Sequence, residues 1–340
     1  MRVGQFFLLI PVVLSQYVYS QDQRYSFTEN KMGSPFSIVL FDRDSVHASF
    51  LAKKSFARVD SLVRIFSDYR NDSELNQLCR SAGTGRWFHC SPALFELMVL
   101  SYVAFKKSKH MFDVTVGPVT HAWRKARKEN IFLASDSVKS KLKLKGFDKV
   151  QFDQATHSIL LKQKGMQIDF GGIAQGYIAQ QVINFLKSEG IKNALVNVSG
   201  DIVCIGKPID KKGWTVAINY PESETELLSK TLTLTNCAVT TSGDVYQFII
   251  HHEKKYSHIV DPKTGYGITS QRNVTVIAPD GTLADWLTKA CSILPTRQAK
   301  KLADSLHAYL LIVELKKGKL IFHSSKNFAQ HWTSDSNPQL

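Results

Sequence analysis

The stretch from Gln167 to Gln181, QIDFGGIAQGYIAQQ, joins a short extended run to two glycines and the start of a helix. The run GMQID predicts a strand that ends at Asp169, and IAQGYIAQQVINFL predicts a helix that stops near Gly190. Glycines let the backbone approach a ligand because no Cβ is present, and the first helical N–H groups form an anion site. A buried turn whose glycines serve only packing has the same pattern, so this stretch alone leaves both interpretations open.

Composition and charge set the class of protein. The chain has 340 residues, of which 44% are hydrophobic and 21% charged, as is typical of a globular protein. A formal net charge of +14 suits an anionic ligand, an acidic membrane surface or nucleic acid. The basic stretches, including RKARK at 124–128, are spread out and carry no nucleic-acid motif, so we interpret most of them as solvated faces and expect no nucleic-acid partner.

The first twenty residues predict a secretory signal peptide at 1–20. Arg2 precedes an apolar run from Phe6 to Leu14, and Val18-Tyr19-Ser20 resembles a cleavage site. The run is too short to span a membrane, and no cysteine follows it for a lipid anchor. A buried N-terminal strand is the alternative. We therefore expect an exported protein, periplasmic or in the cell envelope, that is soluble after cleavage and has no transmembrane segment in the mature chain.

The cysteines give no strong signal. Their spacings are long and include no CxxC pair, so the sequence indicates neither a zinc site nor a redox pair: Cys79, Cys90, Cys204, Cys237 and Cys291. Pairing of Cys79 with Cys90 in an oxidising compartment stays open.

Helices and strands alternate irregularly along the chain, which indicates an α+β fold rather than a regular βαβ repeat. The helix expected at 45–65 has a predicted packed face of Val46, Phe50, Ala57, Leu62 and Ile65. One further helix is expected to start at Ser73-Glu74, and others are expected at 91–108, 124–145 and 283–294. Strands are expected at 31–42, 150–153 and 158–162 and in the β-rich runs after residue 193, with an extended segment and sharp turn at 110–123. We expect one domain at 25–330 and a loose C-terminal tail at 331–340.

Polar, glycine-containing turns recur after the expected strands: FDVTVGP, IDFGGIAQG, VNVSGD, TTSGD and HIVDPKTG. Backbone donors in such turns can converge on phosphates, and their carboxylates can hold a cation. Any one of these turns has a purely structural explanation, but together they predict a site for a polar, phosphate-bearing ligand.

These turns belong to an ordered set of motifs, and with them the chain resembles the ApbE flavin transferases (FAD:protein FMN transferases) from about Met32 to Leu294. The motifs are MGSPFSI, FSDYRNDSELNQL, MFDVTVGP, DFGGIAQGY, VNVSGDI, TTSGD, SHIVDPKTG and the pair Ala284-Asp285. The resemblance implies an ApbE-like (T-fold-like) α+β domain, with mixed or antiparallel sheets packed against helices, that grips an extended FAD. It also implies a magnesium-dependent transfer of FMN from FAD to a Ser or Thr hydroxyl of an acceptor protein, with release of AMP.

The resemblance also assigns roles to residues of this chain. It implies flavin contacts from Met32, Tyr69, Met111, Phe112, Asp113, Asp169, Gln175 and Val260. It implies that Mg²⁺ is held by Gly172, Asp285 and Thr288. His258, in the HIxDP motif, is the candidate that accepts the proton of the acceptor hydroxyl, with Asp285 as the second catalytic residue. A hydrogen-bonded turn residue at His258, and plain core packing of Tyr69 and Phe112, are the alternatives.

Two positions depart from the family pattern. Many members have Lys where this chain has Gln175, and the family commonly has Thr where this chain has Lys289, four residues after Asp285 on one helix face. A protonated lysine is no metal ligand; its ammonium replaces one cation beside Asp285 or points away along the helix. Two alternatives to the transferase therefore stay open: an FAD pyrophosphatase that gives FMN and AMP, and a non-catalytic FAD-binding protein.

Overall fold

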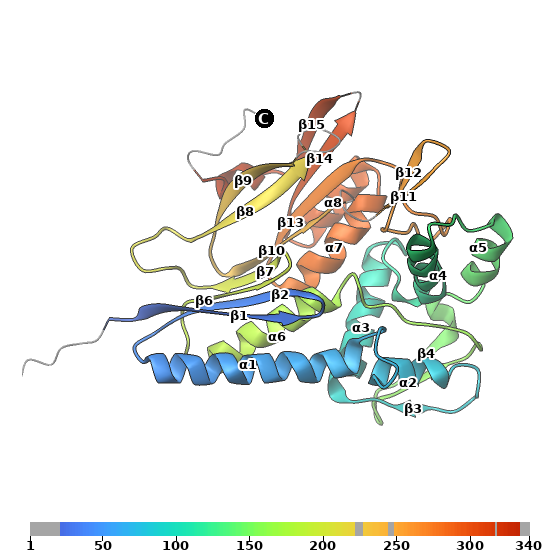
Figure 1. Cartoon of the computed structure of the whole chain (residues 1–340), viewed down its shortest axis with the longest axis horizontal. Helices are drawn as coiled ribbons and strands as arrows, with labels where there is room; N and C mark the ends of the chain where they lie inside the picture. The colour runs from blue at the N-terminus through green and yellow to red at the C-terminus, as the bar shows by residue number, and fades with distance from the viewer. Residues whose placement is uncertain (1–20, 222–226, 244–247, 317, 334–340) are drawn as a thin grey trace, which may run out of the picture.

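The computed structural model describes residues 21–221, 227–243, 248–316 and 318–333. The expected signal peptide at 1–20 lies outside this part of the chain. The fold is α+β, as predicted: an eight-stranded sheet carries helices on one face and a separate β-hairpin on the other (Figure 1).

The large sheet is antiparallel at every step. Its strand order is β1-β2-β6-β7-β10-β13-β14-β15. The strands are β1 (Gln23–Lys31), β2 (Ser34–Asp42), β6 (Ala194–Val198), β7 (Asp201–Ile205), β10 (Cys237–Ser242), β13 (Arg272–Ala278), β14 (Tyr309–Lys316) and β15 (Lys319–Ser324). The strand expected at 31–42 is therefore β2, and it pairs on one side with β1 and on the other with β6.

Both faces of the sheet are buried, and β2 shows how the sequence arranges this. Phe36, Ile38 and Leu40 point into the helical core, whereas Val39 and Phe41 point into a second core on the opposite face. Successive strand residues face opposite sides, so an apolar run without polar alternation indicates burial on both faces. The second core is closed by the hairpin of β8 (Trp214–Pro221) and β9 (Leu227–Leu234), with η3 (Phe328–His331) beside it.

The helical layer contains α1, α3, α6 and α7, with α2 and α8 beside them. Their bounds are α1 Ser45–Phe66, α2 Glu74–Arg80, α3 Pro92–Lys107, α6 Ala174–Ser188, α7 Gly281–Ile293 and α8 Thr296–Ser305. The predicted N-caps Ser73 and Ser91 accept hydrogen bonds from Asn76 N and Leu94 N. The packed face predicted for α1 is right at Leu62 and Ile65 and wrong at Val46, Phe50 and Ala57, which are exposed. The buried stripe reaches Leu62 through Leu51, Ala52, Phe56 and Val59.

Beside the large sheet lies a smaller region, built from short elements between α3 and α6 together with β3, which precedes α3. It contains η1 (Val114–Val116), α4 (Gly117–Glu129), α5 (Ser135–Leu142), η2 (Phe147–Lys149) and the small sheet of β3 (Phe88–His89), β5 (Ser158–Leu161) and β4 (Val150–Asp153). The extended segment predicted at 110–123 is wrong, because α4 already begins at Gly117 with Pro118 in its first turn. The single helix predicted at 124–145 is two helices, since Asn130 takes the left-handed conformation that ends α4.

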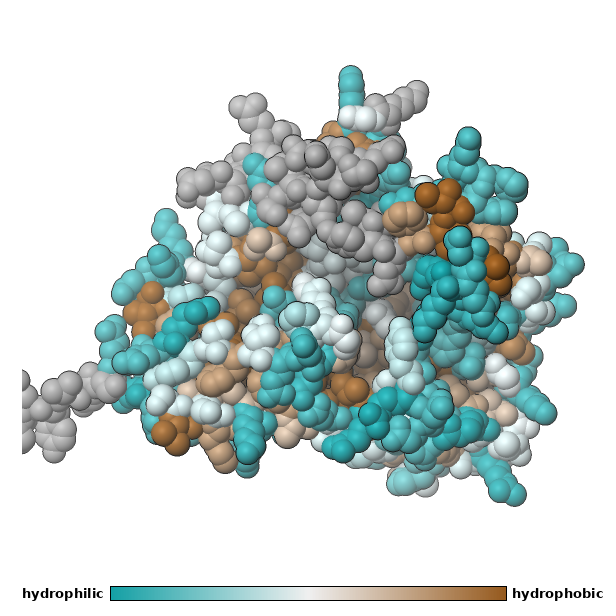
Figure 2. Space-filling view, viewed as in Figure 1, coloured by the Kyte–Doolittle hydropathy of each residue, from teal (hydrophilic) through white to brown (hydrophobic). Residues whose placement is uncertain are grey.

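The hairpin of β11 (Phe248–His251) and β12 (Lys254–Ser257) packs over α4 and α5 through Ile249. Figure 2 shows mostly hydrophilic side chains on this face of the molecule, with an apolar patch at the hairpin, where Ile250 and Phe248 are exposed.

The structure bears on the expected C-terminal tail, on the cysteines and on membrane-spanning helices. Part of the tail predicted at 331–340 is packed, since Trp332 is buried and pairs with Leu232; residues 334–340 lie outside the described chain. Cys79 and Cys90 are both free thiols. Among the described residues, no helix has the length and apolar character needed to cross a membrane.

Candidate functional site

All five glycine-containing turns predicted from the sequence line one cavity of about 930 Å³. They contribute Phe112, Gly172, Asp201, Ser242 and His258, together with their neighbours. These residues lie far apart in the chain, and the end of the large sheet, the helical layer and the α4 region bring them together (Figure 1). A large cavity with convergent polar groups is the expected form of a ligand site.

The Gly-rich turn forms one wall of the cavity. Helix α6 follows it as predicted and ends near Gly190, but the predicted strand before Asp169 is absent. The segment is instead held by isolated hydrogen bonds. Asp169 N donates to Val114 O at 2.8 Å, and Ile168 N donates to Cys79 Sγ at 3.3 Å. Asp169 Oδ1 accepts from Gly171 N at 2.8 Å, which fixes the carboxylate at the start of the turn.

Helices α6 and α7 cross at two glycines in contact. A Cβ placed on Gly176 would lie 2.0 Å from Gly281 O, and one on Gly281 would lie 2.4 Å from Gly176 O. This approach lets Asp285 Oδ2, from α7, accept the Gly176 N–H of α6 at 3.0 Å. The predicted anion site at the start of α6 is therefore partly filled by a carboxylate of the protein itself.

Lys289 and Asp285 form an ion pair beside the cavity. Lys289 Nζ lies 2.7 Å from Asp285 Oδ1, and the Asp285 side chain is fully buried. Burial lowers the pKa of Lys289, but Asp285 and Asp201 outweigh it, so its pKa lies above the ordinary value and the ammonium is charged. Burial raises the pKa of Asp201 to about 7, and the Asp285 charge adds to the rise while Lys289 and Thr240 oppose it. We call Asp201, Asp285 and Lys289 the buried cluster.

The groups expected to hold magnesium do not fit a metal as they are arranged. Both Asp285 carboxylate oxygens already accept a hydrogen bond, and the buried Thr288 hydroxyl donates to Asp285 O at 2.7 Å. A Cβ on Gly172 would lie 3.0 Å from Lys289 Cγ, so the lysine side chain runs between Gly172 and Asp285. A charged ammonium in that position repels a divalent cation.

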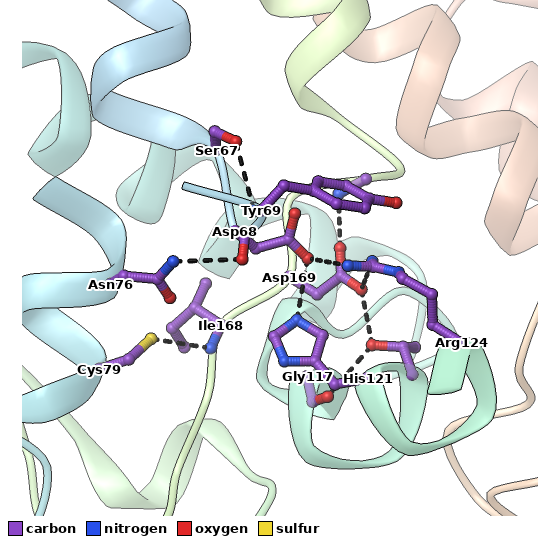
Figure 3. Close-up of polar contacts among 12 residues, drawn as sticks. Ser67, Asp68, Tyr69, Asn76, Cys79, Gly117, His121, Arg124, Ile168 and Asp169 are labelled. Atoms are coloured by element: carbon purple, nitrogen blue, oxygen red, sulfur yellow. Dashed lines mark hydrogen bonds and ion pairs between the residues drawn. The ribbon is translucent and has the colours of Figure 1, made fainter. Parts of the chain in front are cut away.

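A second group of ionisable residues consists of Asp68, Arg124 and Asp169, which line the cavity, and His121, which lies beside them (Figure 3). We call these four residues the rim cluster. Arg124 donates to Asp68 Oδ2 at 2.7 Å and to Asp169 Oδ2 at 3.3 Å, and His121 Nε2 lies 2.8 Å from Asp68 Oδ2. Thr120 donates to Asp169 Oδ2 at 2.6 Å. Thr120, His121 and Arg124 reach these carboxylates because residues three and four apart share one face of α4.

The contacts of the rim cluster favour the charged form of Asp68. Burial raises the pKa of Asp68, but hydrogen bonds from His121 and Arg124 outweigh it and hold that pKa below the ordinary value. Ligand atoms of Asp68, His121 and Asp169 lie within 4.8 Å of one another, a spacing compatible with a metal. Arg124 already donates to both carboxylates, so in this arrangement the two carboxylates are paired with a guanidinium rather than with a metal. Tyr69, which is 71% exposed, lies over the guanidinium at 4.3 Å and leaves its ring open to a ligand.

His258 follows β12 directly and lines the cavity in a half-buried position. Backbone bonds on both sides fix its loop: Ser257 N donates to Ile268 O, and Ile268 N donates to Ile259 O, each at 2.9 Å. The DPKTG turn closes behind it, with Gly265 N bonded to Asp261 O at 2.8 Å. An imidazole held at a cavity wall in this way suits proton transfer to or from a bound group.

Most of the site residues predicted from the sequence line this cavity: Met32, Tyr69, Met111, Phe112, Asp113, Asp169, Gly172, Gln175, His258 and Val260. Asp285 and Thr288 do not; they are buried behind Lys289. The individual roles of all these residues remain predictions.

The sequence reasoning missed four groups at the site. Asp68 and Asp201 stand inside motifs quoted above, but neither was assigned a role. Arg124 and Arg127 belong to one of the basic stretches, and both line the cavity, so they are exceptions to the solvated faces expected for most of these groups. The four-residue spacing of Thr120 and Arg124 was the available signal.

Comparison with known proteins gives the same assignment. The ApbE family matches residues 32–312. An FAD:protein FMN transferase of Klebsiella pneumoniae is 28% identical over 293 residues, covering 82% of this chain and 88% of the relative. One from Haemophilus influenzae is 27% identical over 304 residues, covering 84% and 86%. The crystal structure of Pseudomonas stutzeri flavinyl transferase ApbE, apo form, superposes with a TM-score of 0.81 at 25% identity, covering 92% of this chain and 98% of that one. The chain therefore belongs to the ApbE family.

Proposed function

We propose that this protein is an FAD:protein FMN transferase, which moves FMN from FAD to a Ser or Thr hydroxyl of an acceptor protein and releases AMP. The observation that carries the proposal is the convergence of all five glycine-containing turns on one cavity that also holds His258. The activity named for the relatives from Klebsiella and Haemophilus supports it.

In the proposed step, the acceptor hydroxyl oxygen attacks the FMN phosphorus of FAD. A new P–O bond to the acceptor forms as the P–O bond to AMP breaks, and the bond electrons leave with the AMP phosphate. His258 accepts the hydroxyl proton, and a proton returns to solvent or to the departing AMP. The reaction requires positive charge near the phosphates, because negative charge is redistributed over their oxygens.

Cationic side chains supply that charge in this cavity. Arg124, Arg127 and Lys289 all line it. The family resemblance implies that the reaction depends on magnesium. These residues fit that expectation poorly, because the ammonium of Lys289 already engages Asp285, the expected metal ligand.

The test is to incubate the purified protein with FAD, with and without an acceptor domain that carries a Ser or Thr site. Flavin fluorescence that stays on the acceptor in a denaturing gel, with one AMP per flavin attached, supports transfer. FMN and AMP formed equally well without acceptor would identify a pyrophosphatase, and FAD binding without either product would identify a non-catalytic binding protein.

The His258→Asn variant sharpens this test. Loss of a general base lowers a rate by about 10²- to 10⁴-fold, so FMN transfer should fall by that factor while FAD affinity stays unchanged. His307→Asn is the matched control, because His307 is exposed at the end of α8. A transfer rate within twofold of wild type in His258→Asn would remove the histidine from the mechanism.

We also propose that the protein is exported, with its acceptor outside the cytoplasm, because residues 1–20 carry the pattern of a signal peptide. The expected outcome is a secreted form that begins near Gln21. N-terminal sequencing of material from the periplasm or medium checks this, and a chain that starts at Met1 there would contradict it.

A further inference from the structure

Lys289 occupies a position that its neighbours define closely. Its aliphatic part runs along Gly172, where an added Cβ would lie 3.0 Å from Cγ and 3.7 Å from Cε. Its ammonium ends 2.7 Å from Asp285 Oδ1, and its side chain is 21% exposed while that of Asp285 is 0% exposed. The lysine therefore stands between the buried carboxylate and the cavity, and it forms part of the cavity wall.

The charges around Lys289 explain why a cation is needed there. Asp201 lines the cavity and Asp285 lies behind Lys289, so two acidic groups lie at the wall beside the Gly-rich turn, where the proposed function places the phosphates of FAD. Without a cation, this wall would repel the ligand. An ammonium has three N–H donors, and Asp285 Oδ1 engages one of them.

We propose that Lys289 is a built-in cation of the site, which contacts the FAD phosphates and so makes FAD binding independent of a divalent metal at Asp285. The proposal rests on the proposed function, because it takes FAD as the ligand. It predicts that wild-type protein binds FAD equally well with and without magnesium, whereas removal of the lysine creates a need for the metal.

The experiment is a titration of FAD, followed by flavin fluorescence, in buffer with EDTA and in buffer with millimolar magnesium. The wild-type Kd should agree within about twofold between the two buffers. Lys289→Thr, which leaves a hydroxyl one turn from Asp285, should bind FAD about tenfold or more weakly in EDTA and recover most of that loss with magnesium, since a charge-assisted contact is lost and a cation replaces it. Magnesium titrated by calorimetry without FAD should bind Lys289→Thr more tightly than wild type.

Lys301→Thr is the matched control. It removes the same charge by the same substitution from an exposed position on α8, so it should follow wild type in both buffers. Circular dichroism of each variant shows whether it is folded; if Lys289→Thr is not, the two wild-type titrations still decide the question.

Two results would overturn the proposal: a wild-type FAD affinity that rises about tenfold or more with magnesium, or a folded Lys289→Thr that matches wild type in EDTA. Either leaves the proposed function standing, because FAD still binds. Wild-type protein that binds FAD in neither buffer would instead refute the proposed function, and this inference with it.

Discussion

The buried cluster and the rim cluster lie at the same cavity, and each sets one Lys or Arg side chain against two carboxylates, with His121 as a further member of the rim cluster, yet the two behave differently. Arg124 donates to both rim carboxylates, and the pKa of Asp68 falls. Among the described residues Lys289 donates to Asp285, and the pKa of Asp201 rises to about 7. A guanidinium presents a planar fork to two acceptors, whereas an ammonium is a compact charge on a flexible stem. Donor geometry and burial, rather than charge count, set the state of each cluster.

The largest effect is expected from the buried cluster. Asp285→Ala leaves the Lys289 ammonium without its nearest carboxylate and the Gly176 N–H without its acceptor. Removing one partner of a buried pair typically costs about 3–5 kcal/mol, so the free energy of unfolding should fall by that amount and transfer should be lost. Urea denaturation measures this, with Asp304→Ala on the exposed face of α8 as control. Equal losses in the two variants would mean that the pair contributes nothing to stability.

An intermediate effect is expected from Arg124→Lys in the rim cluster. The charge stays, but one carboxylate loses its donor and Tyr69 loses the flat guanidinium beneath its ring. The free energy of unfolding should fall by about 1–3 kcal/mol, the range for a hydrogen bond to a charged group. Arg297→Lys, on the exposed surface of α8, controls for the substitution itself. If Arg124→Lys were as stable as wild type, the fork would not explain the contrast between the clusters.

The smallest effect is the pH dependence of the rim cluster. The pKa of Asp68 is lower in the folded chain than in the unfolded one, so the unfolded state binds more protons in acid and stability rises with pH. The stability that Asp68 contributes is present above the unfolded pKa of about 4 and is lost as the pH falls through the folded value. The stability difference between wild type and Asp68→Asn should therefore shrink from pH 6 toward pH 3. Parallel urea titrations across this range check the sign, and a widening gap would reverse it.

Local signals predicted much of the fold. Capping serines, Pro92 and the terminal lysines indicated α3, and Gly190 indicated the end of α6, because these features act within one turn of a helix. The face of α1 was mispredicted because apolar Val46 and Phe50 lie on its exposed side. The segment before Asp169 was mispredicted as a strand because an extended apolar run has the same sequence pattern whether or not a neighbouring strand pairs with it.

The sequence predicted most of the residues that line the cavity, but it did not predict the ion pairs among them. Ordered turn motifs identified most of the cavity lining. The partners of Asp68 and Asp285 were harder, since Arg124 lies 56 residues from Asp68 and the contact depends on how α4 packs. Lys289 departs from the family pattern in the sequence, but the direction of its side chain toward Asp285 depends on the fold.

The contact between Gly176 and Gly281 has a consequence for how the cavity wall between α6 and α7 can open. With α6 and α7 so close and the Gly176 amide bonded to buried Asp285, the two helices can separate only by opening the core around them. Hydrogen exchange at the Gly176 amide should therefore proceed through global unfolding rather than through a local fluctuation. We therefore expect this wall of the cavity to be ordered before a ligand binds, so that little conformational entropy of the protein is lost when a phosphate binds there.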